Sequence, residues 1–357
     1  MQTQVHGGDI YSAEYAYDFS TSISPIGVPE GVRAAYAEAA ATLDLYPDVR
    51  CRKLKKAISQ ASSVPEDWIV CSAGAAEVIY AIAYAVSPHS ALLLAPSFSE
   101  YETALRMSGC RDIRYYTCRE ENGFLVGEDI LDCITEDLDI FYLCNPNNPT
   151  GVLVPFELML EIVEACRKKG VLLVLDECYV GLLRHPKQVS MVRRLEGSDS
   201  LIIVNAFTKT YALPGLRLGY ALSSNRHLIE KVRSCMQPWN VSETAQLCGI
   251  AALKEDDYIR RARNAVVEEM SFLKSSFDRM GITWYGSSVN FMFFRGPADL
   301  FDRCAARGIL IRDCSNYRGL GPGFFRVACR SRRENEKLCG SLAEIYTEEN
   351  YRSGKIR

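Results

Sequence analysis

The sequence predicts an α/β fold, in which a mostly parallel sheet of seven strands carries helices on both faces and a smaller α+β domain follows. Short apolar runs alternate with helix-like stretches over the first two thirds of the chain, which is typical of a parallel sheet. After Leu222 this alternation stops, and longer helical patterns follow. The 357 residues suffice for two or three domains, and 48% hydrophobic with 24% charged residues is the composition of an ordinary globular protein.

The strands predicted for the large sheet are short and apolar. They cover residues 68–71, 91–95, 113–117, 140–144, 172–175, 201–205 and 218–222. Ala75–Val86 is apolar on all sides, which suits a helix packed on a sheet. Residues 155–169 begin with Pro and end in Arg-Lys-Lys before Gly170, a pattern that favours a helix between these points.

The remaining elements divide the chain into three parts. Residues 1–30, which contain Pro25, Gly27 and Pro29, predict an irregular N-terminal arm. We expect residues 31–240 to form the large domain, with a first helix that could also pack on the small domain, and residues 241–357 to form the small one. Beyond the sheet, helices are predicted at 225–236, 242–280, 297–307 and 332–346, and strands at 290–295, 309–312 and 324–328.

Composition excludes several classes of protein. The formal net charge of -3 lacks the basic excess of a nucleic-acid-binding protein, so we expect no nucleic-acid partner. No apolar stretch approaches the ~20 residues that span a bilayer, and the first residues do not resemble a signal peptide, so we expect a cytoplasmic protein without membrane contact. The 14 cysteines are scattered singly, without zinc spacing, which favours reduced thiols and no metal site.

Four motifs follow predicted strands, where ligands of parallel sheets bind. Residues 71–77, Cys-Ser-Ala-Gly-Ala-Ala-Glu, place small side chains at a helix N-terminus, where free N–H groups attract phosphate, although a tight turn needs small residues anyway. Residues 145–151, Asn-Pro-Asn-Asn-Pro-Thr-Gly, form either a plain turn or a turn that offers an Asn side chain to a ligand.

The other two motifs carry charge. Asp176 ends an apolar strand and is followed by Glu-Cys-Tyr; it is either a helix N-cap or a buried carboxylate that pairs with a cation. Residues 207–220, Phe-Thr-Lys-Thr-Tyr-Ala-Leu-Pro-Gly-Leu-Arg-Leu-Gly-Tyr, place Lys209 directly after a strand and Arg217 eight positions later. A lone lysine is usually a solvated surface residue.

The order and spacing of the four motifs resemble the class I/II aminotransferases among the fold-type I enzymes that use pyridoxal 5'-phosphate (PLP). NPNNPTG, D-x-x-Y and TKxYxLPGxRxGY together carry this resemblance over nearly the whole chain. It implies the PLP-transferase fold, an arm that lies over the active site, a small-molecule amino-acid substrate and a homodimer with shared active sites.

The resemblance also implies roles for individual residues. Lys209 matches the lysine that bonds covalently to the cofactor aldehyde, and Asp176 the carboxylate that pairs with the pyridine nitrogen. Asn148 and Tyr179 match the pair that hydrogen-bonds the ring 3-hydroxyl, and Phe98 matches the aromatic ring that stacks on the cofactor. With Asp176 and Lys209, the cofactor site then comprises Gly74, Ala75, Ala76, Phe98, Asn148, Tyr179, Thr208 and Arg217, and Tyr46 of the neighbouring subunit.

Two further residues concern the substrate and the cofactor phosphate. Arg326 matches the arginine that binds the substrate α-carboxylate, although a lone arginine on a strand is more often a surface residue. Ala206 departs from the family, which has Ser or Thr three residues before the lysine; one phosphate hydrogen bond, about 1 kcal/mol, should therefore be missing unless Asn205 or Ser72 replaces it.

Two subgroups are similar to this chain, and both act on phosphorylated substrates. Histidinol-phosphate aminotransferases share the Tyr-Pro-Asp, Asn-Pro-Thr-Gly and Arg-Val elements. Threonine-phosphate decarboxylases of cobalamin biosynthesis share more, including residues 6–11, His-Gly-Gly-Asp-Ile-Tyr, and 311–314, Ile-Arg-Asp-Cys. The decarboxylases, however, have Asn-Ile-Asn where this chain has Ser22-Ile23-Ser24, which removes reach and amide donors from the arm.

We therefore predict a PLP-dependent aminotransferase that acts on an amino acid or amine, because the cofactor set is intact while the decarboxylase arm is altered. We expect this substrate to be phosphorylated, as in the histidinol-phosphate enzymes. Threonine-phosphate decarboxylation is the alternative. A nicotinamide dehydrogenase would need a glycine fingerprint at the first helix, and residues 319–323 lie in the wrong domain. A PLP-dependent regulator would need a DNA-binding domain ahead of the fold, for which the arm is too short and not basic.

Overall fold

The computed structural model describes residues 6–286 and 288–352. Its largest element is a seven-stranded sheet in the order β2-β8-β7-β6-β5-β3-β4. Strand β8 is antiparallel to both of its neighbours, and the other pairs are parallel. The strands are β2 Ile69–Ser72, β3 Ser90–Ala95, β4 Asp112–Thr117, β5 Ile140–Cys144, β6 Leu172–Asp176, β7 Leu201–Ala206 and β8 Gly219–Leu222. The predicted fold class and its seven strands are confirmed.

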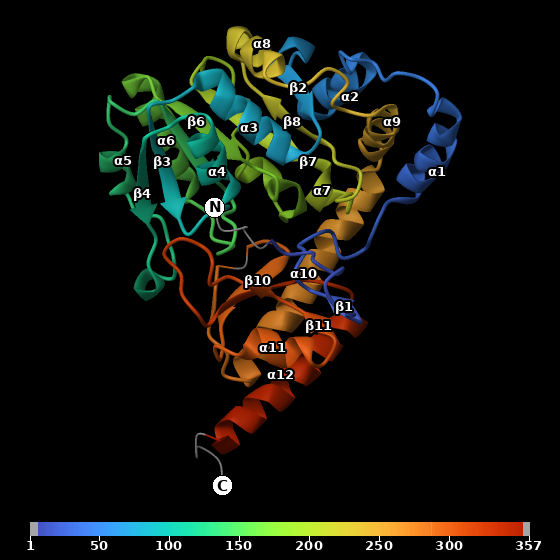
Figure 1. The fold of residues 1–357 in the computed structure, drawn as a ribbon, viewed down its shortest axis with the longest axis vertical. Helices are drawn as coiled ribbons and strands as arrows, with labels where there is room; N and C mark the ends of the chain where they lie inside the picture. The colour runs from blue at the N-terminus through green and yellow to red at the C-terminus, as the bar shows by residue number, and fades with distance from the viewer. Residues whose placement is uncertain (1–5, 287, 353–357) are drawn as a thin grey trace.

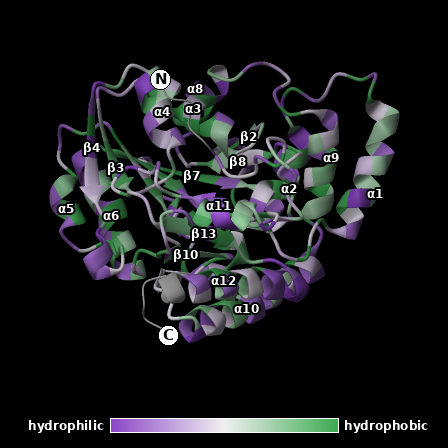
Figure 2. Cartoon of the chain, turned by 60° about the horizontal axis from the view of Figure 1, so that its bottom comes forward, coloured by the Kyte–Doolittle hydropathy of each residue, from purple (hydrophilic) through white to green (hydrophobic). Residues whose placement is uncertain are grey.

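Helices cover both faces of this sheet, as Figure 1 shows. One face packs against α3 (Ala75–Val86), α4 (Glu100–Met107) and α8 (Arg226–Ser234). The opposite face packs against α2 (Arg52–Ser62), α5 (Ile130–Cys133), α6 (Phe156–Lys169) and α9 (Glu243–Ala252). Alternate side chains of the central strands supply the two cores, because a strand points successive residues to opposite faces. The central strands β5, β6 and β7 are therefore mostly apolar, as Figure 2 shows in green, and their polar residues Asp176 and Asn205 lie at or near the strand ends.

A second, four-stranded antiparallel sheet has the order β12-β13-β10-β9. Its strands are β9 Trp284–Tyr285, β10 Phe291–Arg295, β12 Arg312–Asp313 and β13 Phe324–Ala328. Helices α10 (Asp256–Arg279), α11 (Leu300–Ala305) and α12 (Arg332–Arg352) accompany it, and together they enclose a separate apolar core. Strand β13 carries Arg326.

The N-terminal arm lies against the C-terminal part of the chain. Strand β1 (Tyr17–Asp18) pairs in parallel with β11 (Ile309–Leu310), and Ala328 donates a backbone hydrogen bond to Phe19. Helix α1 (Glu30–Ala39) then packs on α9 beside the large sheet. The arm thus runs from the second sheet to the first across the space between them (Figure 1).

Two sequence predictions differ from the structure in detail. The stretch 242–280, predicted as helical without a break, is divided at residues 253–255 into α9 and α10. The acidic pair Asp256–Asp257 opens the second helix, and acidic side chains favour a helix N-terminus. The predicted strand 309–312 is likewise divided, since β11 pairs with the arm while β12 pairs with β13.

Candidate active site

The four motifs meet at one edge of the large sheet. Strands β2, β5, β6 and β7 run parallel, so the loops after them emerge at the same edge. Beyond that edge lies the second sheet, and a cavity of about 360 Å³ separates the two. Of the predicted residues, Ala76, Phe98, Asn148, Tyr179, Lys209 and Arg326 line this cavity.

Lys209 lies in α7 (Phe207–Thr210), a single turn directly after β7. Burial, with the nearby Arg326 and Arg217 guanidinium groups, lowers the pKa of Lys209 to about 8, while Asp176 and the Cys178 thiol act in the opposite direction. A lysine with this pKa holds a substantial fraction of neutral amine near neutral pH, which a nucleophilic amine requires.

Asp176 ends the buried strand β6 and is 6% exposed. One carboxylate oxygen accepts a 2.6 Å hydrogen bond from the Tyr101 hydroxyl, and the other accepts from the backbone N–H of Cys178 at 2.9 Å. Within the described residues no arginine or lysine forms an ion pair with it. A buried carboxylate without a cationic partner is costly, and a protonated ring nitrogen would supply the missing charge.

Asn148 and Arg326 bring the two sheets together at the cavity. Asn148 accepts a hydrogen bond from Arg326, whose other terminal nitrogen donates to the backbone carbonyl of Ser20 at 2.9 Å. The side chain of Arg326 is only 6% exposed, and its Nε atom has no hydrogen-bond partner among the described residues. Such a donor is the kind of group that an anionic ligand would satisfy.

Tyr179 stands between Lys209 and the second sheet. The Lys209 Nζ atom lies 5.5 Å from the centre of its ring, and Phe291 packs edge-on against it at 5.2 Å. Burial raises the pKa of the Tyr179 phenol to about 12, against the opposing effect of Arg326. The phenol therefore stays protonated near neutral pH and can donate a hydrogen bond.

In the turn between β2 and α3 the backbone lies very close to the Arg217 side chain and to the start of β8. Gly74 has φ +87, and a Cβ atom added there would lie 2.5 Å from Nη2 of Arg217. A Cβ added at Gly219 would lie 2.7 Å from the backbone nitrogen of Ala75. The first N–H groups of α3 and the Arg217 guanidinium thus lie beside one another, an arrangement that suits a phosphate group.

Thr208 and Ala206 flank this region on α7 and β7. Thr208 is only partly buried. Of the two candidate replacements for the missing hydroxyl at Ala206, Ser72 already donates its proton to the carbonyl of Gly74 at 2.9 Å. Asn205 accepts from the Ala206 N–H at 2.9 Å through its Oδ1, a bond that does not use its amide donors.

The sequence analysis assigned no role to several residues that line the cavity: His6, Gly7, Ser20, Thr21, Glu100, Arg312 and Tyr317. Arg312 faces Arg326 across β12 and β13, where the two are paired in register. His6 contacts Glu100 at 2.9 Å, and Phe98 lies 6.3 Å from its ring. The motifs around His6 and Arg312 were visible in the sequence, but only the fold shows that both reach the cavity.

Phe98 and Tyr46 occupy different surroundings. Phe98 packs edge-on against Tyr101 at 5.6 Å on the cavity wall. Tyr46 is 81% exposed, packs against Trp239 with the ring centres 5.0 Å apart, and is not among the described residues that line this cavity. Its ring therefore lies on the surface of the single chain.

The fold and the site together define a PLP-dependent enzyme of fold type I. The family described as aminotransferase class I and II matches residues 13–342, and the chain belongs to this family. It is 33% identical over 354 residues to the threonine-phosphate decarboxylase of Salmonella typhimurium, covering 96% of each chain. It is 27% identical to the histidinol-phosphate aminotransferase of Caldicellulosiruptor saccharolyticus, covering 93% of this chain and 92% of the relative.

A solved structure has the same architecture. The histidinol-phosphate aminotransferase of Clostridium acetobutylicum superposes with a TM-score of 0.87 at 26% identity, covering 93% of this chain and 99% of that one. The cofactor of the family, PLP, supplies an electron sink when bound. The residues present fit this cofactor. The carboxylate of Asp176, which has no cationic partner among the described residues, suits its ring nitrogen. The amine of Lys209 suits its aldehyde, and the close approach at Gly74 suits its phosphate. No described helix of the chain is long and apolar enough to cross a membrane.

Proposed function

We propose that this protein decarboxylates a small O-phosphorylated amino acid, using PLP bound to Lys209. The observation that carries the proposal is the pair Arg312 and Arg326, two arginines that are each 6% exposed and line the same cavity as Lys209. Within the described residues neither guanidinium forms an ion pair, and Arg312 donates to the backbone carbonyl of Asp313 and to the side chain of Asn316. Two anionic groups or one dianion would neutralise the two charges. A phosphorylated amino acid carries both a carboxylate and a phosphate.

Similarity to a known relative supports a short substrate. The 33% identity to a threonine-phosphate decarboxylase over nearly the whole chain favours a substrate of that kind. The arm residues His6 and Gly7, which belong to a segment similar to those decarboxylases, line the same cavity as Lys209.

Within this proposal the residues have distinct tasks. Lys209 bonds to the cofactor and, once released by the substrate, delivers a proton to the α carbon. Asp176 keeps the ring nitrogen protonated, and Asn148 and Tyr179 hold the ring hydroxyl. Phe98 stacks on the ring. Gly74, Ala75, Ala76, Thr208 and Arg217 hold the cofactor phosphate.

Transamination is the second candidate, and the rigidity of Arg326 favours it. Asn148 and the Ser20 carbonyl fix the guanidinium. A carboxylate held by such an arginine stays in place, so the C–H bond at the α carbon is the one left to break. Decarboxylation would instead require that the α-carboxylate is free to leave as carbon dioxide, so Arg326 would not hold it in place. The two reactions therefore differ in which anion Arg326 holds.

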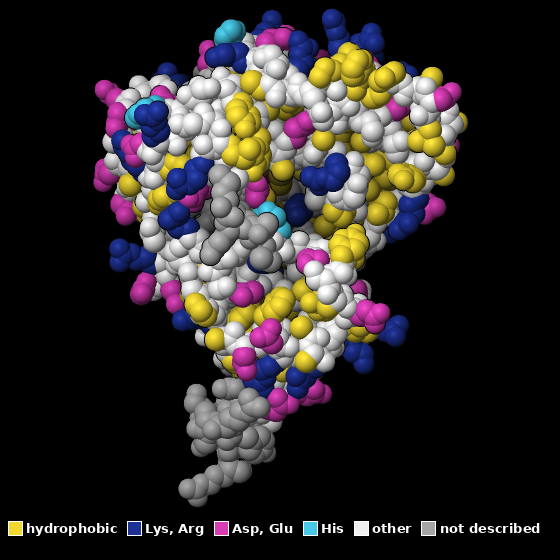
Figure 3. Space-filling model, in the orientation of Figure 1, with side chains coloured by type: hydrophobic (Ala, Val, Ile, Leu, Met, Phe, Trp, Pro, Cys, Tyr) yellow, Lys and Arg dark blue, Asp and Glu magenta, His cyan; other side chains and the backbone are white. Residues whose placement is uncertain are grey.

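We also propose that two chains form a homodimer with shared active sites. A surface that we call the apolar patch carries large exposed side chains: Tyr36, Leu43, Leu45, Tyr46, Val49 and Trp239. Yellow side chains cover this part of the surface in Figure 3. Large exposed apolar groups of this kind mark protein interfaces, and Tyr46 would then reach the site of the partner.

One assay separates the two reactions. The PLP-loaded protein is incubated with O-phospho-L-threonine or with histidinol phosphate, each with and without 2-oxoglutarate. Decarboxylation predicts carbon dioxide from phosphothreonine without the keto acid. Glutamate formed only when 2-oxoglutarate is present would instead support transamination. Release of neither product from either substrate would contradict the proposal of a phosphorylated substrate.

A further inference from the structure

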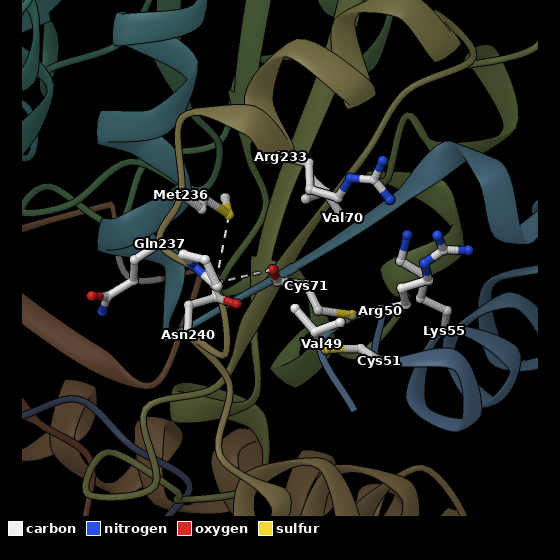
Figure 4. A pocket seen from close by; sticks show the side chains of 11 residues that line it. Val49, Arg50, Cys51, Lys55, Val70, Cys71, Arg233, Met236, Gln237 and Asn240 are labelled. Atoms are coloured by element: carbon white, nitrogen blue, oxygen red, sulfur yellow. Dashed lines mark hydrogen bonds between the residues drawn. The ribbon is translucent and has the colours of Figure 1, made fainter. Parts of the chain in front are cut away.

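Two cysteines that are far apart in the sequence meet in a pocket outside the active site. Cys51 precedes α2, and Cys71 lies in β2; each is 5% exposed. Figure 4 shows the two sulfur atoms side by side, and each thiol affects the pKa of the other. Both residues line a pocket of about 260 Å³ that opens to solvent in the single chain. Small oxidants can reach them there.

The pocket is electropositive. Arg50, Lys55 and Arg233 line it together with the two cysteines (Figure 4). The hydrogen bond from Cys71, with help from Lys55, lowers the pKa of the Cys51 thiol, against burial and the carboxylates of Asp48 and Glu243.

The second thiol has the opposite character. The hydrogen bond to Cys51 and burial raise the pKa of the Cys71 thiol. The Cys51 thiol therefore loses its proton more readily than the Cys71 thiol, an asymmetry that suits one attacking and one resolving cysteine.

We propose that Cys51 and Cys71 form a reversible disulfide when the protein meets a hydroperoxide. The Cys51 sulfur attacks the peroxide, the O–O bond breaks, and a sulfenic acid and one water (or alcohol) form. The Cys71 sulfur then attacks the Cys51 sulfur, the S–O bond breaks, and a second water leaves with the Cys71 proton. The dithiol is oxidised by two electrons, and the peroxide is reduced by two.

The position of this bond connects it to two functional segments. Cys51 has φ +50 and ends the segment that carries Tyr46. Cys71 directly precedes the turn that leads to Gly74. Its carbonyl accepts a hydrogen bond from Asn240, and Asn240 also donates to Glu77 at 2.6 Å. A disulfide here would tie the apolar patch to the turn that we assign to the cofactor phosphate.

The test uses the purified PLP-loaded full chain and hydrogen peroxide at equimolar concentration. Remaining thiols are blocked with N-ethylmaleimide, and the protein is digested with Glu-C, which cleaves after Glu38, Glu66 and Glu77. We expect a cross-linked species that joins peptides 39–66 and 67–77 and that is lost after treatment with dithiothreitol. Intact-mass analysis should show a loss of about two hydrogens per chain.

Matched variants make the result decisive. Cys51→Ser and Cys71→Ser should each abolish the cross-linked species, whereas Cys133→Ser, which removes a partly exposed thiol of α5 outside this pocket, should leave it unchanged. The proposal is overturned if Cys51 is oxidised without linkage to Cys71, if either thiol links to another cysteine, or if peroxide leaves both thiols free to react with N-ethylmaleimide. Circular dichroism of each serine variant checks that the fold is retained.

Discussion

The hydroxyl of Tyr101 donates a 2.6 Å hydrogen bond to the carboxylate of Asp176. Tyr101 is 1% exposed, lies on α4 and reaches across the sheet edge to the end of β6. This contact fixes one oxygen of the carboxylate, while the Cys178 N–H fixes the other. Tyr101 therefore orients the group that we assign to the ring nitrogen of the cofactor.

Tyr101→Phe should weaken PLP binding. Loss of one hydrogen bond to a buried carboxylate costs about 1–2 kcal/mol, which corresponds to a roughly five- to thirtyfold rise in Kd. Equilibrium titration of the apo protein with PLP, followed by absorbance, measures it. Tyr142→Phe is the matched control, because Tyr142 stacks on Tyr101 but donates to the carbonyl of Ile79. Equal loss in both variants would contradict the assignment.

Gly74→Ala should lower PLP affinity more strongly. The added methyl group would clash with Arg217 at a backbone conformation that already disfavours L-residues. Gly109→Ala is the control, since Gly109 has a similar φ of +92 but no atom within 4 Å of the added Cβ. Gly109→Ala should lower the melting temperature alone. If both variants keep wild-type PLP affinity, Arg217 does not hold the phosphate.

The rate at which the apo protein bonds covalently to PLP should rise with pH and level off above a midpoint near 8. The amine of Lys209 reacts only when neutral, and its pKa is about 8. Stopped-flow absorbance between about pH 6 and 10 follows this reaction. Arg326→Gln should shift the midpoint upward, because Arg326 is one of the groups that lowers this pKa. A Lys209→Ala protein should develop no imine absorbance band.

Arg312→Ala should reduce kcat/KM for a phosphorylated substrate by about 10–100-fold, the range expected for loss of a charge-assisted hydrogen bond. Activity toward the same amino acid without phosphate should change much less. Arg326→Ala should weaken substrate capture far more than PLP retention. Discrimination between phosphorylated and unphosphorylated substrates that survives in Arg312→Ala would remove Arg312 from the phosphate site.

Shared active sites predict complementation between two inactive variants. Tyr46→Ala lacks the side chain that we place in the site of the partner, and Lys209→Ala lacks the lysine of its own site. Co-refolding the two should restore about a quarter of the wild-type activity, because half of the dimers are mixed and each mixed dimer has one intact site. No recovery in mixtures that analytical ultracentrifugation shows to be dimeric would refute a role for Tyr46 across the interface.

The sequence alone predicts those helices and strands whose residue pattern lies within the element itself. Ala75–Val86 was predicted with the bounds that the structure gives, because its apolar pattern and flanking small residues lie within the element itself. The alternation of apolar runs likewise predicted every strand of the large sheet. The division of 242–280 was missed because no proline or glycine marks residues 253–255; packing of α9 on α1 decides where that helix ends.

The contributions of His6 and Arg312 could not be predicted for a different reason. They come from opposite ends of the chain, and their convergence depends on the pairing of β1 with β11 and of β12 with β13. Long-range strand pairing leaves no local pattern in the sequence. Family resemblance supplied roles for the residues on the large sheet, whose motifs are contiguous, but not for the cavity wall made by the arm.

The contact between Arg326 and the Ser20 carbonyl joins residues that are 306 positions apart. During synthesis the first residues leave the ribosome long before their docking surface exists, so residues near Ser20 must wait while nearly the whole polypeptide is translated. Closure of the cavity is consequently among the last events of biogenesis, and premature termination between α9 and β13 would yield chains that contain every strand of the large sheet but leave the site open.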